Sequence, residues 1–198
     1  DIGGTKISGA LVKDGSIISE VKKVQTPKEL SLLYETLKAM IKAFQIEYTF
    51  EKVGIATAGV VDIAKNTVIS ASENLCKGYA STDFNKIIAH ELAIDLIVDN
   101  DANAAAYGEY KYGAAKGFKN VLVITIGTGI GAGIILDGNI YRSSNFSAGE
   151  CGHIPIRQDK KIKCTCGNYD CWEVYASGNG LLNIAELCTE KKKKKAFA

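Results

Sequence analysis

The sequence predicts an α/β fold. Short apolar segments typical of strands alternate along the chain with segments whose apolar residues recur at helical spacing. Two strands also meet glycine-rich turns, "DIGGTK" at residues 1–6 and "GTGIG" at residues 127–131. The 198 residues suit one large domain or two small ones and can bury a sizeable core.

The first half of the chain alternates strands with helices. Residues 7–12 and 16–24 are separated by Lys-Asp-Gly, which favours a hairpin between two strands. In residues 28–44 the leucines and other apolar residues recur three and four positions apart, which predicts a helix with one apolar face. The elements expected next are a short buried strand at 52–59, a hairpin at 60–70, a helix at 84–92 and a strand at 95–100.

The second half repeats the pattern and then changes character. Asp and Asn at the front of residues 101–115 can cap a helix. Residues 120–140 read as strand, glycine-rich turn, strand and Asp-Gly turn. A loop region that contains most of the cysteines follows, with a helix from about residue 172. We therefore expect a small lobe over residues 1–102 and part of a larger lobe over 103–198.

Composition excludes several classes of protein. There are 24 basic and 22 acidic residues, and much of the positive balance lies in one lysine run at 191–195, which predicts a solvated tail. A nucleic-acid binder normally carries its basic residues on a folded face, so we expect no nucleic-acid partner. No apolar stretch reaches the roughly 18–20 residues of a membrane span. The clustered cysteines favour a reducing compartment, hence a cytoplasmic protein.

Both ends of the sequence look cut. The chain starts at Asp1, inside a strand-to-turn junction and without an apolar strand before it. It stops shortly after an amphipathic segment at residues 180–188. We therefore expect a fragment of a longer protein.

The two glycine-rich turns are candidate phosphate-binding loops. In the first turn (residues 1–6), adjacent glycines allow backbone amides to approach a ligand, Thr5 and Lys6 add a hydroxyl and a cation, and Asp1 could hold a magnesium ion. The second turn (residues 127–131) lacks the ending of a Walker loop and is followed by a strand, which argues against a dinucleotide fold. Either turn alone could be an ordinary hairpin turn. Together they could grip one polyphosphate from opposite sides, which indicates a nucleotide cleft.

The segment "VDNDANAAA" at residues 98–106 places Asn100 and Asp101 where a strand ends and a helix begins. Ordinary helix capping is the commoner role of such residues. However, two carboxylates and two amides within five residues exceed what one cap requires, and α/β sites gather at strand ends. A carboxylate at this place could accept a hydroxyl proton during phosphoryl transfer.

Cys164, Cys166 and Cys171 lie close together, and His153 precedes them by eleven residues or more. These four side chains would make a closed, tetrahedral Cys3His zinc site. The alternatives are a packed or exposed histidine and an accidental grouping of cysteines. The remaining cysteines fit no metal pattern and are expected to be buried thiols: Cys76, Cys151 and Cys188.

Two glutamates accompany this cysteine loop. Glu173 follows Cys171 by two residues, on the first turn of the expected helix, so a metal that fixes the loop would also fix the direction of Glu173. Its alternative role is a negative charge that is favoured at a helix N-terminus. Glu150 and His153 lie three residues apart and could face one pocket.

The segments "DIGGTK", "NDANAAA", "IGTGIGAGI", "SAGECGH" and "CTCGNYDCWEVYAS" resemble the ROK family in their order and spacing. This family comprises bacterial-type sugar kinases, including glucokinases, and related repressors. The resemblance covers essentially the whole chain. It implies an α/β fold of the two-lobed actin/hexokinase-like (ribonuclease H-like) type around an ATP cleft, incomplete here at both ends.

The resemblance also implies residue roles. Asp101 takes the position of the catalytic base, and a structural Zn2+ and a Mg2+ that accompanies ATP are the implied ions. The implied sugar ligands are Gly59, Asn74, Asn100, Asp101, Glu150, His153 and Glu173. The implied ATP-binding residues are Asp1, Gly3, Gly4, Thr5, Lys6, Gly127, Thr128, Gly129, Gly131 and Gly133. The implied zinc ligands are His153, Cys164, Cys166 and Cys171.

The implied activity is ATP-dependent phosphorylation of a hexose, of the glucokinase type that makes glucose 6-phosphate in glycolysis. Kinases for N-acetylmannosamine, fructose or allose, and a sugar-responsive transcriptional repressor, are the alternatives. We expect sugar and ATP as small-molecule partners, no membrane partner, and a homodimer of the full-length protein. Three departures from the family pattern are Asp170 in place of a usual glycine, the lack of a strand before the first turn, and the lack of adenine-contacting segments.

Overall fold

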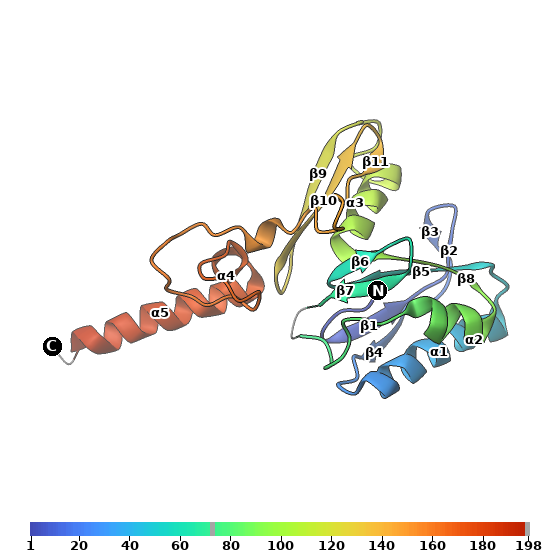
Figure 1. The fold of residues 1–198 in the computed structure, drawn as a ribbon, viewed down its shortest axis with the longest axis horizontal. Helices are drawn as coiled ribbons and strands as arrows, with labels where there is room; N and C mark the ends of the chain where they lie inside the picture. The colour runs from blue at the N-terminus through green and yellow to red at the C-terminus, as the bar shows by residue number, and fades with distance from the viewer. Residues whose placement is uncertain (72–73, 197–198) are drawn as a thin grey trace. The chain divides into compact units, whose positions relative to one another are not determined.

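The computed structural model describes residues 1–71 and 74–196, except for the side chains of 190–196. Strands and helices alternate along it, which confirms the α/β class (Figure 1). The chain divides into two compact units, Asp1–Ala104 and Ala105–Ala198, slightly beyond the boundary at 102/103 proposed from the sequence. Helix α3 (Asp101–Tyr112) contains the division.

The first unit begins with paired strands. Strand β1 (Lys6–Gly9) is antiparallel to β4 (Lys22–Gln25), and β2 (Val12–Lys13) forms a small hairpin with β3 (Ser16–Ile17). The expected hairpin is therefore present, but each of its two strands is broken in two, the first into β1 and β2 and the second into β3 and β4. Strand β5 (Lys52–Thr57), further along the chain, runs parallel to β8 (Asp95–Asn100).

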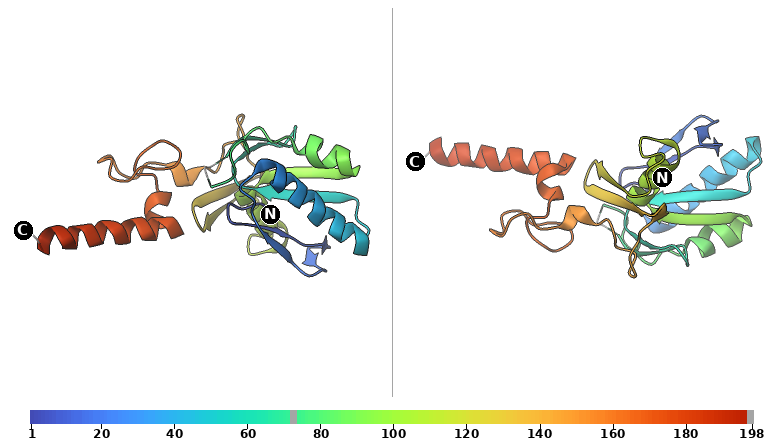
Figure 2. Two further views of the ribbon diagram at one scale, coloured as in Figure 1. Left: turned by 90° about the horizontal axis from the view of Figure 1, so that it is seen from below. Right: turned by 90° about the horizontal axis from the view of Figure 1, so that it is seen from above.

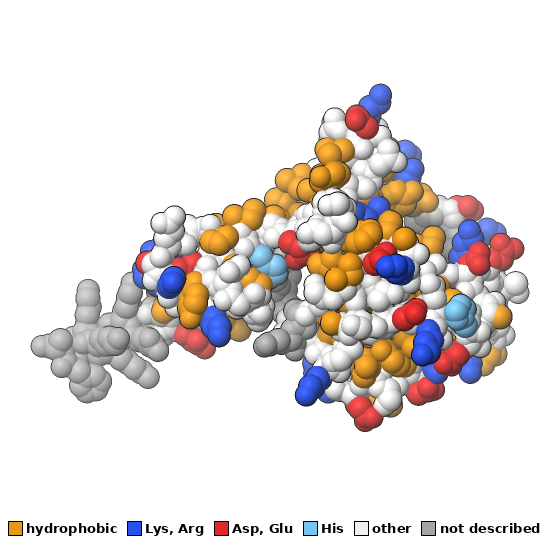
Figure 3. Space-filling model, viewed as in Figure 1, with side chains coloured by type: hydrophobic (Ala, Val, Ile, Leu, Met, Phe, Trp, Pro, Cys, Tyr) orange, Lys and Arg blue, Asp and Glu red, His pale blue; other side chains and the backbone are white. Residues whose placement is uncertain are grey.

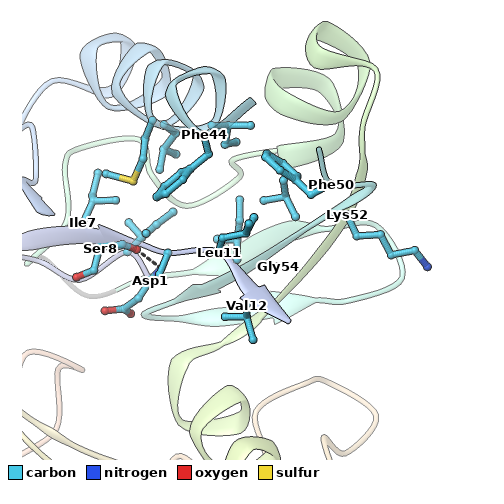
Figure 4. A pocket seen from close by; sticks show the side chains of 17 residues that line it. Asp1, Ile7, Ser8, Leu11, Val12, Phe44, Phe50, Lys52 and Gly54 are labelled. Carbon is cyan, nitrogen blue, oxygen red and sulfur yellow. Dashed lines mark hydrogen bonds between the residues drawn. The ribbon is translucent and has the colours of Figure 1, made fainter. Parts of the chain in front are cut away.

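Ile2 joins β1 to β5 through an antiparallel bridge to Ile7 and a parallel bridge to Thr57. Beside it lies a cavity of about 380 Å3 between the edges of β1 and β5, below α1 (Leu30–Glu47) (Figure 4). The labelled side chains that line the cavity are mostly apolar and include Ile7, Leu11, Phe44 and Phe50.

Two helical segments pack on the strands of the first unit. Helix α1 buries Leu33, Leu37 and Phe44, as its apolar spacing predicted. The helix expected at 84–92 is present as a π-helical turn, Asn85–Ala89, followed by α2 (His90–Leu92). Lys38 of α1 pairs with Glu91 of α2 at 2.7 Å. The expected hairpin at 60–70 consists of β6 (Val60–Asp62) and β7 (Thr67–Ser70). The fully buried core side chains include Ile2, Ile7, Leu33, Val61, Val68, Tyr79, Phe84, Ile88 and Val98.

The second unit contains an antiparallel sheet in the order β11–β10–β9. Its strands are β9 (Val121–Ile126), β10 (Ile130–Leu136) and β11 (Asn139–Ile140), as the sequence predicted. Alternate residues of β9 are exposed, with Leu122 at 61%, Ile124 at 42% and Ile126 at 68%. Hydrophobic side chains consequently gather on this part of the surface (Figure 3).

The cysteine loop lies between a short 3-10 helix, Cys151–His153, and α4 (Glu173–Ala176). The helix expected from residue 172 is present in two parts, because Ser177 is extended and separates α4 from α5 (Gly178–Ala196). Figure 2 shows α5 as one continuous helix. The side chains of the lysine run lie outside the described part of the structure. Among the described residues, no helix has the length and apolar character needed to cross a membrane.

The structure corrects the expectation for the three remaining cysteines. Cys76 is buried as predicted, but Cys151 is half-buried and Cys188 is exposed on α5. A thiol on a solvent-facing position of an amphipathic helix satisfies the helical pattern without entering a core, so burial could not be deduced from residue type alone.

Candidate functional site

Asn100 terminates β8 and caps α3. Its Oδ1 atom accepts hydrogen bonds from the backbone amides of Ala102 at 2.9 Å and Asn103 at 3.1 Å. Its Nδ2 atom donates to the carbonyl oxygen of Gly59 at 3.0 Å. The amide therefore satisfies the orphan donors of the helix and ties the strand end to the turn that contains Gly59.

The side chains of Asp99 and Asn103 are also held by the protein. Asn103 is buried, and its Nδ2 atom donates to Asp99 Oδ1 at 3.2 Å. The same Asp99 oxygen accepts the backbone amide of Asn100 at 2.8 Å. Each of these three polar side chains thus makes a hydrogen bond within the protein, although the buried Oδ1 atom of Asn103 has no partner among the described residues.

Asp101 is the fourth, and it differs from the other three. The residue is exposed, and its Oδ1 atom accepts a hydrogen bond from the adjacent backbone amide of Ala102, at 2.8 Å. Desolvation by the surrounding protein raises the pKa of the carboxyl group, against the opposing effect of hydrogen bonds from Ala102 and Asn100. A carboxylate with a raised pKa and access to solvent is suited to accept a proton.

The first glycine-rich turn is held by residues that the sequence analysis missed. Thr26 is buried, and its Oγ1 atom donates to the carbonyl oxygen of Gly3 at 2.6 Å. Lys28 Nζ donates to the carbonyl oxygens of Gly4 and Asn74, at 3.1 Å each. A Cβ atom on Gly4 would lie 3.0 Å from that of Asn74, so a larger residue there would have to push Asn74 away. These contacts join residues far apart in the sequence, and no local pattern indicates them.

The second glycine-rich turn joins β9 to β10 and packs against the end of the cysteine loop. The amide of Gly178, at the start of α5, donates to the carbonyl oxygen of Gly127 at 2.8 Å. Glu173 Oε2 accepts the amide of Ile130 at 3.4 Å and occupies the place where a side chain on Gly129 would begin. The turn is therefore shaped partly by a glutamate that the sequence analysis assigned to the sugar.

Glu150, His153 and Glu173 are brought together in the second unit, as their spacing suggested. Glu150 Oε2 lies 3.7 Å from His153 Nε2, and Glu173 Oε1 lies 3.5 Å from His153 Nδ1. All three side chains are only partly buried. Two carboxylates and an imidazole in this arrangement can donate and accept hydrogen bonds to the hydroxyl groups of a ligand.

The three cysteines and the histidine also converge. The ligand atoms of His153, Cys164, Cys166 and Cys171 lie within 4.8 Å of one another. Cys164 Sγ is 3.5 Å from His153 Nδ1, and Cys166 Sγ is 3.6 Å from Cys171 Sγ. A tetrahedral zinc ion with ordinary bond lengths would separate a sulfur and a nitrogen by about 3.6 Å and two sulfurs by about 3.8 Å. These residues therefore fit a zinc ion.

The thiols of this cluster influence one another. Burial, with hydrogen bonds from the neighbouring thiols, raises the pKa of Cys171 to about 12. Burial also raises the pKa of Cys164. A cation that binds here must displace protons, because the thiolate is the ligand.

Asp170 occupies a left-handed conformation, with φ of 57°, directly before Cys171. Burial opposes its ionisation, but hydrogen bonds from Tyr175 and from the amides of Ile162 and Lys161 outweigh this effect and lower its pKa. The sequence analysis noted Asp170 only as a departure from a glycine. The conformation that glycine favours is nevertheless preserved.

The expected site residues fall into two sets. The first glycine-rich turn, Gly59, Asn74, Asn100 and Asp101 belong to the first unit. The second glycine-rich turn, Glu150, Glu173 and the Cys3His cluster belong to the second. In the first unit the contacts above join Gly4 to Asn74 and Asn100 to Gly59, and in the second they join the turn to Glu173 and both glutamates to His153.

Known proteins resemble this chain over almost its whole length. The ROK family pattern matches residues 1–197. A glucokinase of Streptomyces coelicolor is 38% identical over 187 residues, which cover 94% of this chain and 57% of that protein. A xylose repressor of Bacillus spizizenii is 34% identical over 199 residues, which cover 98% of this chain and 50% of that protein.

A solved structure shows the same likeness. The ROK family glucokinase of Streptomyces griseus, in complex with glucose and AMPPNP, superposes with a TM-score of 0.85 and 36% identity. The match covers 98% of this chain and 61% of that one. It confirms the actin/hexokinase-like fold that the resemblance implied. The chain spans about half to three fifths of the length of these relatives.

Proposed function

Because the chain belongs to the ROK family, we propose that the intact protein is a kinase that transfers the γ-phosphoryl group of ATP to a hydroxyl group of a hexose. Asp101 is the observation that carries the proposal. Its neighbours Asp99, Asn100 and Asn103 are bound to the protein itself, whereas its carboxylate is exposed and has a raised pKa. A helix cap needs neither property.

Asp101 acts as general base in this proposal. It accepts the proton of the attacking hydroxyl as the oxygen forms its bond to the γ-phosphorus atom. The bond between that phosphorus and the bridging oxygen breaks, and ADP leaves. The magnesium ion that accompanies ATP neutralises charge on the phosphates, and the exposed carboxylate of Asp1 can supply one oxygen ligand.

The two glycine-rich turns bind the phosphates. In the first turn, Gly3, Gly4, Thr5 and Lys6 offer backbone amides, a hydroxyl and an ammonium group. In the second turn, the ATP-binding residues proposed are Gly127, Thr128, Gly129, Gly131 and Gly133. Support comes from the contacts that hold the first turn, because Thr26 and Lys28 occupy the carbonyl oxygens of Gly3 and Gly4. The amide of Gly3 donates within the turn to the carbonyl oxygen of Lys6 at 3.0 Å, so the amides proposed for the phosphates are those of Gly4 and Thr5.

The proposed hexose ligands are Gly59, Asn74, Asn100 and Asp101 in the first unit and Glu150, His153 and Glu173 in the second. Asn100 uses its carbonyl oxygen for the helix cap and donates one Nδ2 hydrogen to Gly59, so it contributes through the second Nδ2 hydrogen. Glucose is the first candidate because a glucokinase is among the relatives. N-acetylmannosamine, fructose and allose are the alternatives within the same reaction.

A structural zinc ion is held by His153, Cys164, Cys166 and Cys171. The tetrahedral spacing of their ligand atoms supports this. His153 would bind the ion through Nδ1, which faces Cys164, and would keep Nε2, which faces Glu150, for the sugar. The ion orders the loop, and the loop directs Glu173.

A sugar-responsive repressor is the second candidate, because a xylose repressor covers the same residues with 34% identity. Both classes need the sugar-binding residues, but a repressor needs neither a general base nor phosphate-binding turns. The presence of Asp101 and of both turns favours the kinase.

The test is a coupled assay of ADP release by the intact protein with a panel of hexoses. ADP release that depends on one hexose supports the kinase. Sugar binding without any ADP release would support the repressor.

We also propose that the intact protein is a cytoplasmic homodimer that acts in carbohydrate metabolism.

A further inference from the structure

We propose that Asp170 is a positioning residue that holds the cysteine loop in its metal-binding geometry. The proposal rests on the Cys3His zinc site proposed above. Asp170 is not a ligand, yet its side chain is completely buried, with 0% exposure. Tyr169, which precedes Asp170, is exposed, and Trp172, which follows Cys171, is half-buried.

The carboxylate of Asp170 joins two segments of the loop. Its Oδ1 atom accepts the amides of Lys161 at 3.0 Å and Ile162 at 2.9 Å, and its Oδ2 atom lies 3.1 Å from the amide of Lys161. The hydroxyl of Tyr175, on α4, donates to Oδ1 at 2.7 Å. One buried side chain therefore binds both the segment that precedes the three cysteines and the helix that follows them.

The backbone of Asp170 supports the same arrangement. Its amide donates to the carbonyl oxygen of Ile162 at 2.8 Å, and its carbonyl oxygen accepts the amide of Ile156 at 2.9 Å. Cys164 follows Ile162 by two residues, and Cys171 directly follows Asp170. The hydrogen bonds between Asp170 and Ile162 therefore hold the chain next to Cys164 beside the chain next to Cys171, and so help to fix the distance between these two ligands.

This arrangement gives the carboxylate a role that apolar packing does not fill. The buried apolar cluster of the loop consists of Cys164, Cys171 and Val174, so hydrogen bonds must supply much of its order. Without the carboxylate, two amides and a hydroxyl would lose their acceptor. We expect the ligands to spread and metal binding to weaken. Partners that orient metal ligands typically change metal affinity by about 10- to 100-fold.

The left-handed conformation of Asp170 permits a clean substitution. Glycine adopts φ of 57° without strain, so Asp170→Gly removes the carboxylate and leaves the turn possible. Asparagine also tolerates this conformation and keeps Oδ1, so Asp170→Asn is the conservative variant. Asp137→Gly is the matched control, because Asp137 has φ of 48° and is exposed in the second unit.

The experiment measures zinc release from the intact protein to an excess of a chromogenic chelator. The absorption spectrum of the cobalt-substituted protein is recorded in parallel. We expect Asp170→Gly to release zinc about 10- to 100-fold faster and to alter the cobalt spectrum. Asp170→Asn should stay within a few-fold of wild type, and Asp137→Gly should not change release. If Asp170→Gly does not fold, Tyr175→Phe, which removes one donor to the same carboxylate, should release zinc severalfold faster.

The outcomes separate the two proposals. A wild-type protein that binds no zinc overturns both the metal site and this role of Asp170. A wild type with full zinc, together with a glycine variant that releases it at the wild-type rate, overturns the role of Asp170 alone. Equal acceleration by Asp137→Gly also overturns it, because the effect would then be general loosening of the unit.

Discussion

Asp101→Asn in the intact protein separates chemistry from structure. The amide keeps the size of the side chain and one oxygen for the hydrogen bond from Ala102, which is 2.8 Å long. It cannot accept the proton of the attacking hydroxyl. We expect turnover to fall by about 10²- to 10⁴-fold, the usual contribution of a positioned acid or base, whereas sugar affinity should change only a few-fold.

Stability should not fall with activity. The cap of α3 is supplied by Asn100, whose Oδ1 atom accepts two amides, so Asp101→Asn leaves the cap in place. Desolvation also raises the pKa of Asp101 in the folded state. The native state therefore holds the proton more tightly than the unfolded chain, and stability is lost as pH rises through the interval between the two pKa values. Since asparagine avoids that loss, its melting temperature at neutral pH should equal or exceed that of wild type.

Three measurements test this reasoning: coupled ADP release, sugar affinity and thermal unfolding. Wild-type kcat/KM should fall on the acidic side as Asp101 is protonated, at a pH above the ordinary value of 3.8 for Asp. Asn100→Ala is the contrasting variant, because loss of the cap should cost about 0.5–2 kcal/mol of stability. Near-normal turnover with asparagine at position 101 would refute Asp101 as the base and with it the kinase mechanism proposed here.

Three further predictions concern the second unit. Cys166→Ser should reduce bound zinc and, through the loosened loop, weaken sugar binding; metal loss with unchanged sugar affinity would disprove this coupling. Zinc affinity should decrease as pH is lowered from about 8 to 6, by up to about tenfold per pH unit for each proton displaced. The reason is that burial raises the pKa of Cys171 to about 12 in the metal-free cluster, so protons compete with the metal. Competition with a chelator across that pH range measures the zinc affinity. Gly129→Ala should displace Glu173, whose Oε2 atom would lie 2.6 Å from the new Cβ, and raise the KM for the sugar. Gly108→Ala on α3 serves as the control, because its new Cβ meets no atom within 4 Å.

Local pattern was sufficient for most of the fold. The helix at 28–44, the hairpin at 60–70 and the strand–turn–strand at 120–140 each carry their own periodicity or turn residues. Two details depend on packing instead. The π-helical turn at Asn85–Ala89 places Ile88 in the core, which a simple helical spacing does not indicate. Ser177 breaks the last helix so that Gly178 can reach the second glycine-rich turn, a contact between distant residues.

The site was less completely predictable. Spacing placed Glu150 beside His153 and grouped the three cysteines, because these residues share one loop. It did not indicate Thr26 or Lys28, since their contacts with the first turn cross more than twenty residues of chain. Spacing also could not assign separate roles to the polar residues of 99–103. Only their hydrogen-bond partners distinguish the helix cap from the candidate base.

The cysteine loop has little apolar core, which is why the proposed zinc ion and the buried carboxylate of Asp170 would matter for its order. Ile154 and Ile156 of this loop are 57% and 52% exposed, so they contribute little apolar burial. Fixing each backbone residue costs about 1–2 kcal/mol of conformational entropy, which such a loop cannot recover by packing. Strong, directional contacts must order it instead, and Glu173 gains its direction from them: its carboxylate lies 3.5 Å from His153 Nδ1 and 3.4 Å from the amide of Ile130. Loss of these contacts, more than loss of the exposed isoleucines, should therefore misdirect Glu173.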